Sequence, residues 1–436
     1  MNKSKYIVVL LSAGLLVCST GCKEKDLYDP EKVKEINEQL APIGEVDPAH
    51  NWKTTGKATI SVQATIGGVD VQRVYILSKE PAASASTILG ESDLAGTSSK
   101  YTSVTISYPL SANLIYAAAV DGDGRIWLKA FNPRSGVVDM SDAELSEVHT
   151  LPDYEAYTYL FEDCYPEPSE DWDFNDLVLR VSHLPSDNDH ELKLRVSLCA
   201  VGTLNIVGAA INLINYQYDD IDSISTIKGS REGVNYNTNL PDQYRLYIKE
   251  EENLVKGRNN EAVINVMNDA HWGMVPKMDE DGTELGSVDR KYYNVHNAAT
   301  ADGSSQSLVP QVVTFTIHFK NPKLLNLFTL ADLDVFMLKD FNGSTWEVHS
   351  YEHKNAAILK NQGRTAELQE TNITPYALVI PTMTFRWPLE GVHIGIYKNG
   401  ILSGAYQEPG HSFGEWAADA ASARDWYFYP TTNRVY

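Results

Sequence analysis

The strongest constraint on this chain is an acidic stretch that runs directly into an apolar one. Residues 161–176 place seven carboxylates within sixteen positions, and residues 177–182 follow as a typical strand sequence. Like charges repel one another, and gathering them beside a buried strand makes physical sense if a cation lies among them. Oxygen ligands on short Asp and Asn side chains suit Ca²⁺ better than other biological metals. We therefore predict a calcium site at the start of this strand.

The spacing of the acidic residues resembles the beginning of an EF-hand loop but does not complete it. Asp171, Asp173 and Asn175 stand at alternate positions, as the first three EF-hand ligands do. An EF-hand then requires Gly at the sixth position and Glu at the twelfth, where this chain has Asp176 and Ser182. The predicted calcium site is therefore of another kind.

Both ends of the acidic stretch can contribute to one site. Trp172 and Phe174 are expected to point away from the cation and into the core. The predicted metal ligands are Glu162, Asp163, Asp171, Asp173, Asn175 and Asp176. The alternative is a solvated loop whose Asp and Asn side chains cap turns and accept hydrogen bonds from backbone N–H groups.

The N-terminus predicts export and lipidation. Lys3 and Lys5 precede an apolar run at residues 6–17, which is too short to span a bilayer and typical of a signal peptide. Small residues before Cys22 form a loose lipobox, which predicts a lipid on that cysteine and a membrane anchor. An ordinary secretory signal that is cleaved near Gly21 is the alternative.

Charge and cysteine content limit the possible partners. The formal net charge is −22, and loss of Lys3 and Lys5 with the signal makes it −24. A chain this acidic is a poor binder of nucleic acid and of anionic lipid. Of the four cysteines, Cys164 and Cys199 remain after processing and lipidation, and the sequence leaves open whether they form a disulfide.

Period-two alternation of apolar residues predicts a mainly β chain. It is clear at residues 58–66, 190–198 and 312–319, and frequent turns separate the strands in the N-terminal part. We expect an immunoglobulin-like β-sandwich there, followed by a larger β-rich domain of sandwich or jelly-roll type. Asp-Gly-Asp-Gly at residues 121–124 predicts a hairpin turn. Residues 201–215 alternate little, so that strand and helix both stay open.

The acidic stretch and the C-terminal aromatic residues carry a family resemblance. Residues 161–163 and 171–178, with the aromatic motifs at 385–391 and 405–427, resemble the LruC-type domain (DUF4842 region) of Bacteroidetes surface lipoproteins. The resemblance implies a noncatalytic, all-β protein that is anchored at the outer membrane and faces the cell exterior. The expected organisation is a signal peptide (1–21), a lipidated tether (22–50), a β-sandwich (51–149) and the LruC-type domain (150–436).

Catalytic motifs give little support for an enzyme. Residues 349–353 fit the letters H-x-x-E-H, but the alternating flank predicts a strand, in which residues four apart lie about 13 Å apart, too far to share one zinc. No nucleophile elbow, P-loop or dinucleotide motif occurs. We therefore expect a role in extracellular binding, adhesion or surface structure, with a glycan or a host or surface protein as partner.

Two other functions and one modification stay open. The alternative functions are a surface glycan hydrolase with paired carboxylates and a pilus-like structural subunit. Asp222-Ser223-Ile224 also fits a short pattern for bacterial O-glycosylation, which would modify Ser223.

Overall fold

The computed structural model describes residues 44–164, 171–230, 253–274, 292–294, 311–341, 344–350 and 375–436. The predicted signal peptide, the lipidation site at Cys22 and most of the tether lie outside these ranges. The prediction of a mainly β protein is confirmed, because strands dominate the described residues and build several antiparallel sheets. From Pro42 onward the chain forms one compact unit, and the expected domain limits at residues 51, 149 and 150 remain predictions.

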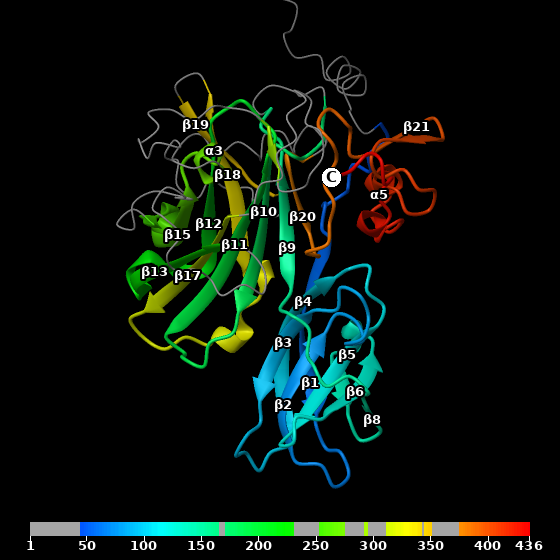
Figure 1. The fold of residues 1–436 in the computed structure, drawn as a ribbon, viewed down its shortest axis with the longest axis vertical. Coiled ribbons are helices and arrows are strands. Elements are labelled where there is room, and N and C mark those ends of the chain that lie inside the picture. The colour runs from blue at the N-terminus through cyan, green and yellow to red at the C-terminus, as the bar shows by residue number, and fades with distance from the viewer. Residues whose placement is uncertain are drawn as a thin grey trace, which may run out of the picture. The chain divides into compact units, whose positions relative to one another are not determined.

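The first part of the chain forms a two-sheet sandwich (Figure 1). Alternating residues such as Ile60 and Val62 in one sheet and Val74 and Ile76 in the other form a common buried core. One sheet has the order β4-β1-β7, with β1 Thr55–Gln63, β4 Tyr101–Pro109 and β7 Val137–Asp139. The other has the order β3-β2-β5-β6-β8, with β2 Val71–Leu77, β3 Ile88–Asp93, β5 Ile115–Asp121, β6 Ile126–Phe131 and β8 Glu144–Leu145.

The predicted hairpin turn at residues 121–124 joins β5 to β6. Asp121 Oδ1 accepts hydrogen bonds from the backbone N–H groups of Asp123 and Arg125, both at 3.0 Å. Its other oxygen accepts from Arg125 Nε at 2.8 Å. The acidic side chain therefore closes the turn, as Asp residues commonly do.

The larger part of the chain is a second pair of sheets around one core. The seven-stranded sheet contains β9 Ala156–Phe161, β10 Leu177–Leu184, β11 Glu191–Val201, β13 Ile221–Ser230, β16 Tyr293–Asn294, β17 Gln311–Phe319 and β20 Ala377–Ile380. The five-stranded sheet contains β12 Val207–Gln217, β14 Leu254–Lys256, β15 Glu261–Met267, β18 Leu333–Phe341 and β19 Ser344–Val348. Leu194 of β11, Ile211 of β12 and Val335 of β18 belong to the same buried cluster. The ambiguous residues 201–215 are thus largely strand.

The helical segments among the described residues are short. They are α3 His271–Met274, α5 Phe413–Ala418 and the 3₁₀ turns Pro133–Ser135, Tyr218–Asp220, Arg258–Asn260, Leu325–Leu327, Leu330–Asp332 and Trp426–Phe428.

The H-x-x-E-H motif begins at His349, directly after a strand, as predicted. His349 comes directly after β19 and is buried, with Nδ1 2.9 Å from Asp334 Oδ2 and Nε2 2.9 Å from Glu347 Oε2. Burial alone would lower the pKa of His349, but the two carboxylates raise it to about 9. The imidazole is therefore held as a buried cation between two anions. Glu352 and His353 lie outside the described residues.

Residues 385–436 form what we call the C-terminal lobe, an aromatic cluster with little regular structure. It contains α5 and the hairpin of β21 Ile396–Lys398 and β22 Ile401–Ser403. The buried ring of Trp426 stacks edge-on against Phe385, Tyr406 and Phe413 at centroid distances of 5.9, 5.0 and 4.9 Å. Aromatic pairs of this geometry contribute about 0.5–1.5 kcal/mol each beyond simple burial.

The segment that leads into β1 is attached to the C-terminal lobe. Two backbone hydrogen bonds join residues 44–52 to this lobe. They run from Glu45 N to Tyr397 O and from Asp47 N to Ala417 O, and each is 2.9 Å long. Trp52 is buried and its ring packs edge-on against Trp416 at 5.5 Å. The beginning and the end of the described chain are therefore joined.

Glu155 is a buried carboxyl group just before β9. Its oxygens accept hydrogen bonds from Thr87 Oγ1 at 2.6 Å and from the backbone N–H of Ala156 at 3.1 Å. Burial nevertheless raises the pKa of Glu155 to about 7. The folded protein thus favours the protonated form more than the unfolded chain does.

This shift makes the stability of the protein pH-dependent. A folded pKa above the unfolded value contributes stability that is complete below about pH 4.5 and is lost as the pH rises through about 7. We expect Glu155→Gln to remove about 3 kcal/mol of this pH dependence. Urea unfolding at pH 5 and pH 8 measures it. Glu144→Gln, at an exposed glutamate, is the control and should keep the wild-type slope.

Candidate metal centre

The acidic stretch connects two neighbouring strands. The register pairs Leu177 at the start of β10 with Phe161 at the end of β9, so both ends of the connection lie at the same edge of the sheet. A hydrogen bond of 2.6 Å from Asp163 N to Asp176 Oδ2 closes this end. Residues 165–170 lie outside the described residues. The topology thus gathers the predicted ligands into one region.

Trp172 and Phe174 lie in the core, as predicted. Both side chains are buried in the main hydrophobic cluster. Their backbones have φ angles of 45° and 55°, in the left-handed region that bulky residues avoid. Such conformations cost about 1–3 kcal/mol each and occur where surrounding contacts enforce them, often at functional sites.

Three carboxylates converge beside these rings. Among the described residues, Asp171, Asp173 and Glu390 each offer an oxygen within 4.8 Å of the other two. Ca²⁺ binds oxygens at about 2.3–2.6 Å, so ligands around one ion stand up to about 5 Å apart. The three oxygens therefore fit a shared calcium ion. Two of these ligands were predicted from the sequence, and Glu390 was not.

The segment that carries Glu390 holds the loop in place. Gly391 N donates to Asp173 Oδ2 at 2.8 Å, and Ile394 N donates to Trp172 O at 2.9 Å. Asn175 Nδ2 donates to Pro388 O at 3.3 Å. These bonds join the acidic loop to the C-terminal lobe at the candidate site.

Two oxygens at this contact are buried without a hydrogen bond. They are Asn175 Oδ1 and Glu390 Oε2. Buried polar atoms are nearly always paired, because desolvation without a partner costs about 1–3 kcal/mol. Glu390 Oε2 belongs to one of the three converging carboxylates, whereas Asn175 Oδ1 faces Gly202, where a Cβ atom would lie 1.8 Å from it. A bound cation would satisfy Glu390 Oε2.

The local pKa values show how unfavourable the negative charge is here. Burial, together with the nearby charge of Asp171, raises the pKa of Glu390 to about 7. Burial and neighbouring carboxylates also hold the pKa values of Glu162, Asp173 and Asp176 well above their usual range. A divalent cation would reverse this trend, since it stabilises the ionised form.

Asp163 lies in a different environment from the other predicted ligands. Its Oδ2 accepts hydrogen bonds from Asn205 Nδ2 at 2.9 Å and from Thr203 Oγ1. The buried Lys339 Nζ lies 3.8 Å from its other oxygen and also donates to its backbone carbonyl. An internal ammonium group therefore balances the charge of Asp163. Asp163 and Asp176 are not in the group of three converging carboxylates.

Glu162 is next to the converging group and is bonded within the loop. Its Oε1 accepts a hydrogen bond from Phe174 N at 2.5 Å. Glu162 is fully buried, and the charge of Asp173 adds to its raised pKa. This contact agrees with the alternative hypothesis of a capped loop, because the carboxylate accepts a hydrogen bond from a backbone N–H group of the loop.

Other candidate residues lie away from this site. Ser223 is exposed on β13, where an enzyme could reach its hydroxyl. Cys164 and Cys199 are present as thiols: Cys164 Sγ lies 4.0 Å from Glu162 Oε2, and Cys199 Sγ lies 3.7 Å from Ser197 O.

Comparison with known proteins places the chain in a family. The family model described as "Domain of unknown function (DUF4842)" matches residues 188–427, more than half of the 436 residues. The chain belongs to the DUF4842 family. The matched range includes Glu390 but begins after Asp171 and Asp173, so this DUF4842 protein combines site residues from inside and outside it.

A solved structure shares the fold of this DUF4842 protein. It is a Bacteroides ovatus protein provisionally described as a lipoprotein, with a TM-score of 0.51 and 16% identity over 84% of this chain and 99% of that one. A membrane-anchored protein of Corynebacterium diphtheriae, also provisionally described, covers 74% of this chain and 58% of its own at 12% identity, but its TM-score of 0.17 is too low to indicate a common fold. No curated protein sequence matches the chain.

Gly202 provides a test of how tightly the loop is packed. A Cβ atom at this position would lie 1.8 Å from Asn175 Oδ1 and 2.7 Å from its carbonyl oxygen. We expect Gly202→Ala to displace Asn175 and to destabilise the protein by about 1–3 kcal/mol, as overpacking does, measured by urea unfolding. Gly67→Ala, where a Cβ meets nothing within 4 Å, is the control and should stay close to wild type.

Proposed function

We propose that this DUF4842 protein is a noncatalytic, lipid-anchored protein of the outer surface whose acidic loop binds a structural Ca²⁺ ion. The observation that carries the calcium part is the convergence of Asp171, Asp173 and Glu390, with the buried Glu390 Oε2 left without a hydrogen bond. A partly buried cluster of carboxylates is unfavourable alone and becomes favourable with a cation among them.

The anchor is supported by the N-terminal sequence. The apolar run at residues 6–17 and the small residues before Cys22 are typical of an exported, lipidated protein. The description of the Bacteroides ovatus protein as a lipoprotein agrees with this. No helix among the described residues is long and apolar enough to span a bilayer. The proposed location is the outer membrane, with the folded part facing the exterior.

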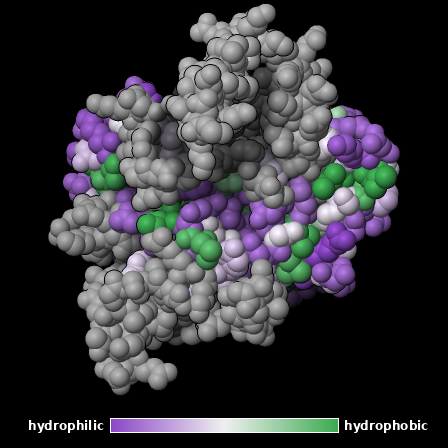
Figure 2. Space-filling model, turned by 90° about the horizontal axis from the view of Figure 1, so that it is seen from above, coloured by the Kyte–Doolittle hydropathy of each residue, from purple (hydrophilic) through white to green (hydrophobic). Residues whose placement is uncertain are grey.

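The exposed surface suits a role in extracellular binding or surface structure. On the face shown in Figure 2, hydrophobic side chains of the described residues are scattered among hydrophilic ones. On the described part of this face, the pattern favours a polar partner, such as a glycan or the hydrophilic surface of another protein, over a broad apolar interface.

Calcium binding is tested best with Glu390→Gln, because the calcium and capping hypotheses predict opposite changes in melting temperature when calcium is removed. In chelator, Glu390→Gln should raise the melting temperature, since it removes a buried carboxylate that its neighbours repel. In about 1 mM Ca²⁺, wild type should gain roughly 3 kcal/mol if the dissociation constant is near 10 μM, and Glu390→Gln should gain almost nothing. Scanning calorimetry and calcium titration, with Mg²⁺ for comparison, measure both effects.

The matched control is Glu408→Gln, which changes an exposed glutamate in the same lobe. It should keep the full calcium response. Equal destabilisation of Glu390→Gln with and without calcium would support the capping alternative instead, as would the absence of calcium heat in wild type.

The lipid anchor is tested by Cys22→Ser in the full chain, expressed in a bacterium that processes lipoproteins. Wild type should partition into the detergent phase on Triton X-114 separation, because the acyl chains are apolar. Cys22→Ser should move to the aqueous phase, while the control Cys18→Ser stays in the detergent phase. Detergent partitioning of Cys22→Ser would contradict the proposed lipid site.

A further inference from the structure

A cavity of about 270 Å³ lies between the first sandwich and the larger pair of sheets. Its walls come from β3, from residues 154–155, from the turn after β10 and from the 3₁₀ turns near residues 325–330. It shares no residue with the candidate metal centre. The volume corresponds to roughly nine water molecules, which is also the scale of one sugar ring.

The inner wall is polar but carries little free charge. Burial lowers the pKa of His183 to about 4, so the imidazole is neutral, and burial raises the pKa of Glu155 to about 7. Tyr154 OH donates to Glu91 Oε2 at 2.5 Å, and Arg73 Nη1 lies 3.5 Å from Glu91 Oε1. The carboxyl oxygens of Glu91 and Glu155 thus already accept hydrogen bonds from protein groups.

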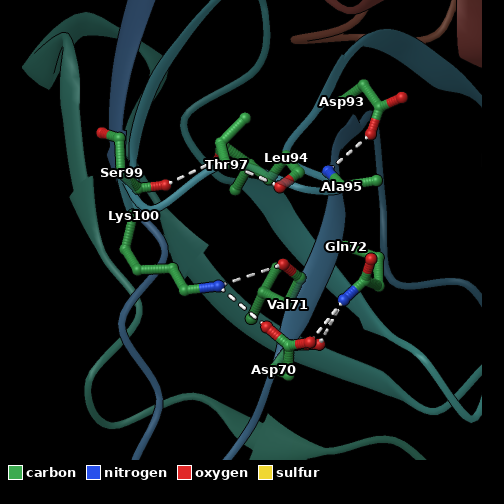
Figure 3. Close-up of polar contacts among 9 residues, drawn as sticks. All are labelled: Asp70, Val71, Gln72, Asp93, Leu94, Ala95, Thr97, Ser99 and Lys100. Atoms are coloured by element: carbon green, nitrogen blue, oxygen red, sulfur yellow. Dashed lines mark hydrogen bonds and ion pairs between the residues drawn. The ribbon is translucent and has the colours of Figure 1, made fainter.

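The mouth of the cavity carries fixed polar groups. Figure 3 shows the turn that positions Asp93, whose Oδ1 accepts a hydrogen bond from Ala95 N at 2.8 Å. Thr97 Oγ1 donates to Leu94 O in the same turn at 3.0 Å. The hydrogen bond from Ala95 lowers the pKa of Asp93, and Arg73 Nη2 lies 3.4 Å from its other oxygen. Asp93 therefore stays ionised and held at the rim.

Three polar side chains of the cavity have no hydrogen bond within the described part of the chain. They are His183, Asp187 and Asn326. The ring of His183 packs edge-on against the ring of Phe328 at a centroid distance of 4.9 Å. Together they offer donors and acceptors next to an aromatic ring, which is the combination that polar ligands with an apolar face require.

These features select an uncharged ligand with many hydroxyl groups. An anion would meet Asp93 and Asp187, and a cation would compete with Arg73 for its carboxylate partners. A sugar ring has hydroxyl groups that both donate and accept, and its C–H face packs on aromatic side chains. We propose that this cavity binds one neutral sugar unit, such as the terminal ring of a surface glycan. This goes beyond the proposed calcium site and does not depend on it.

The test uses the full chain in detergent and an array of neutral glycans that end in hexoses or N-acetylhexosamines, with matched glycans that end in uronic acids. The best neutral glycan is then titrated by calorimetry. Asn326→Trp places a bulky ring at the exposed mouth and should weaken binding tenfold or more. Leu327→Trp changes the next, also exposed, residue outside the cavity lining and should bind as wild type does.

Each result decides the proposal. Neutral glycan binding that Asn326→Trp removes and Leu327→Trp preserves supports it. The proposal is overturned if no neutral glycan binds, if uronic acids bind as well, or if Asn326→Trp, with an unchanged melting temperature, binds normally. Repeating the titration in chelator separates the two sites: sugar binding should persist there, and a protein that binds Ca²⁺ but no sugar would refute only the cavity.

Discussion

Repulsion between buried carboxylates at one end of a hairpin governs how the larger part of this protein is assembled. Glu162, Asp173 and Asp176 come from the connection between β9 and β10, and Glu390 comes from the C-terminal lobe. Removing such charges from water costs several kcal/mol per ion unless partners replace the water. The sheet edge and the lobe can meet only where those partners exist.

The chain supplies some of these partners itself. Backbone N–H groups of Phe174 and Gly391 donate to carboxylates of the loop, and Lys339 neutralises Asp163. Asp171, Asp173 and Glu390 form a separate group, and Asp163 is not one of its members. The arrangement divides the acidic stretch into a part next to Lys339 and a part at which we propose the calcium ion.

The alternation of apolar and polar residues predicted those strands that have one buried and one solvent-exposed face. The alternation of β11 is preserved in the structure, with Leu192 and Leu194 buried and Lys193 and Arg195 partly exposed between them. β12 was ambiguous for a physical reason: residues from Val207 to Leu213 are all buried, so both faces of that strand are covered and no alternation is needed.

The same limit applies to the site. Asp171 and Asp173 could be proposed because their spacing is local. Glu390 reaches them through a tertiary contact that no local pattern encodes, although it lies within the C-terminal motif, residues 385–391, that carried the family resemblance. The role of Lys339 was equally invisible, because a lysine in a strand usually faces solvent.

The attachment of residues 44–52 to the C-terminal lobe has a mechanical consequence. A pull on the N-terminal side of Gly44 reaches the folded chain first at the backbone bonds to Tyr397 and Ala417 and at the packing of Trp52 on Trp416. The load then falls on the lobe and on its contacts with the acidic loop. The sandwich of β1–β8 begins at Thr55, after these contacts along the chain, so the contacts bear the tension before the sandwich does. A protein held on a membrane under flow would therefore be strained at its C-terminal end, although it is tethered by its N-terminus.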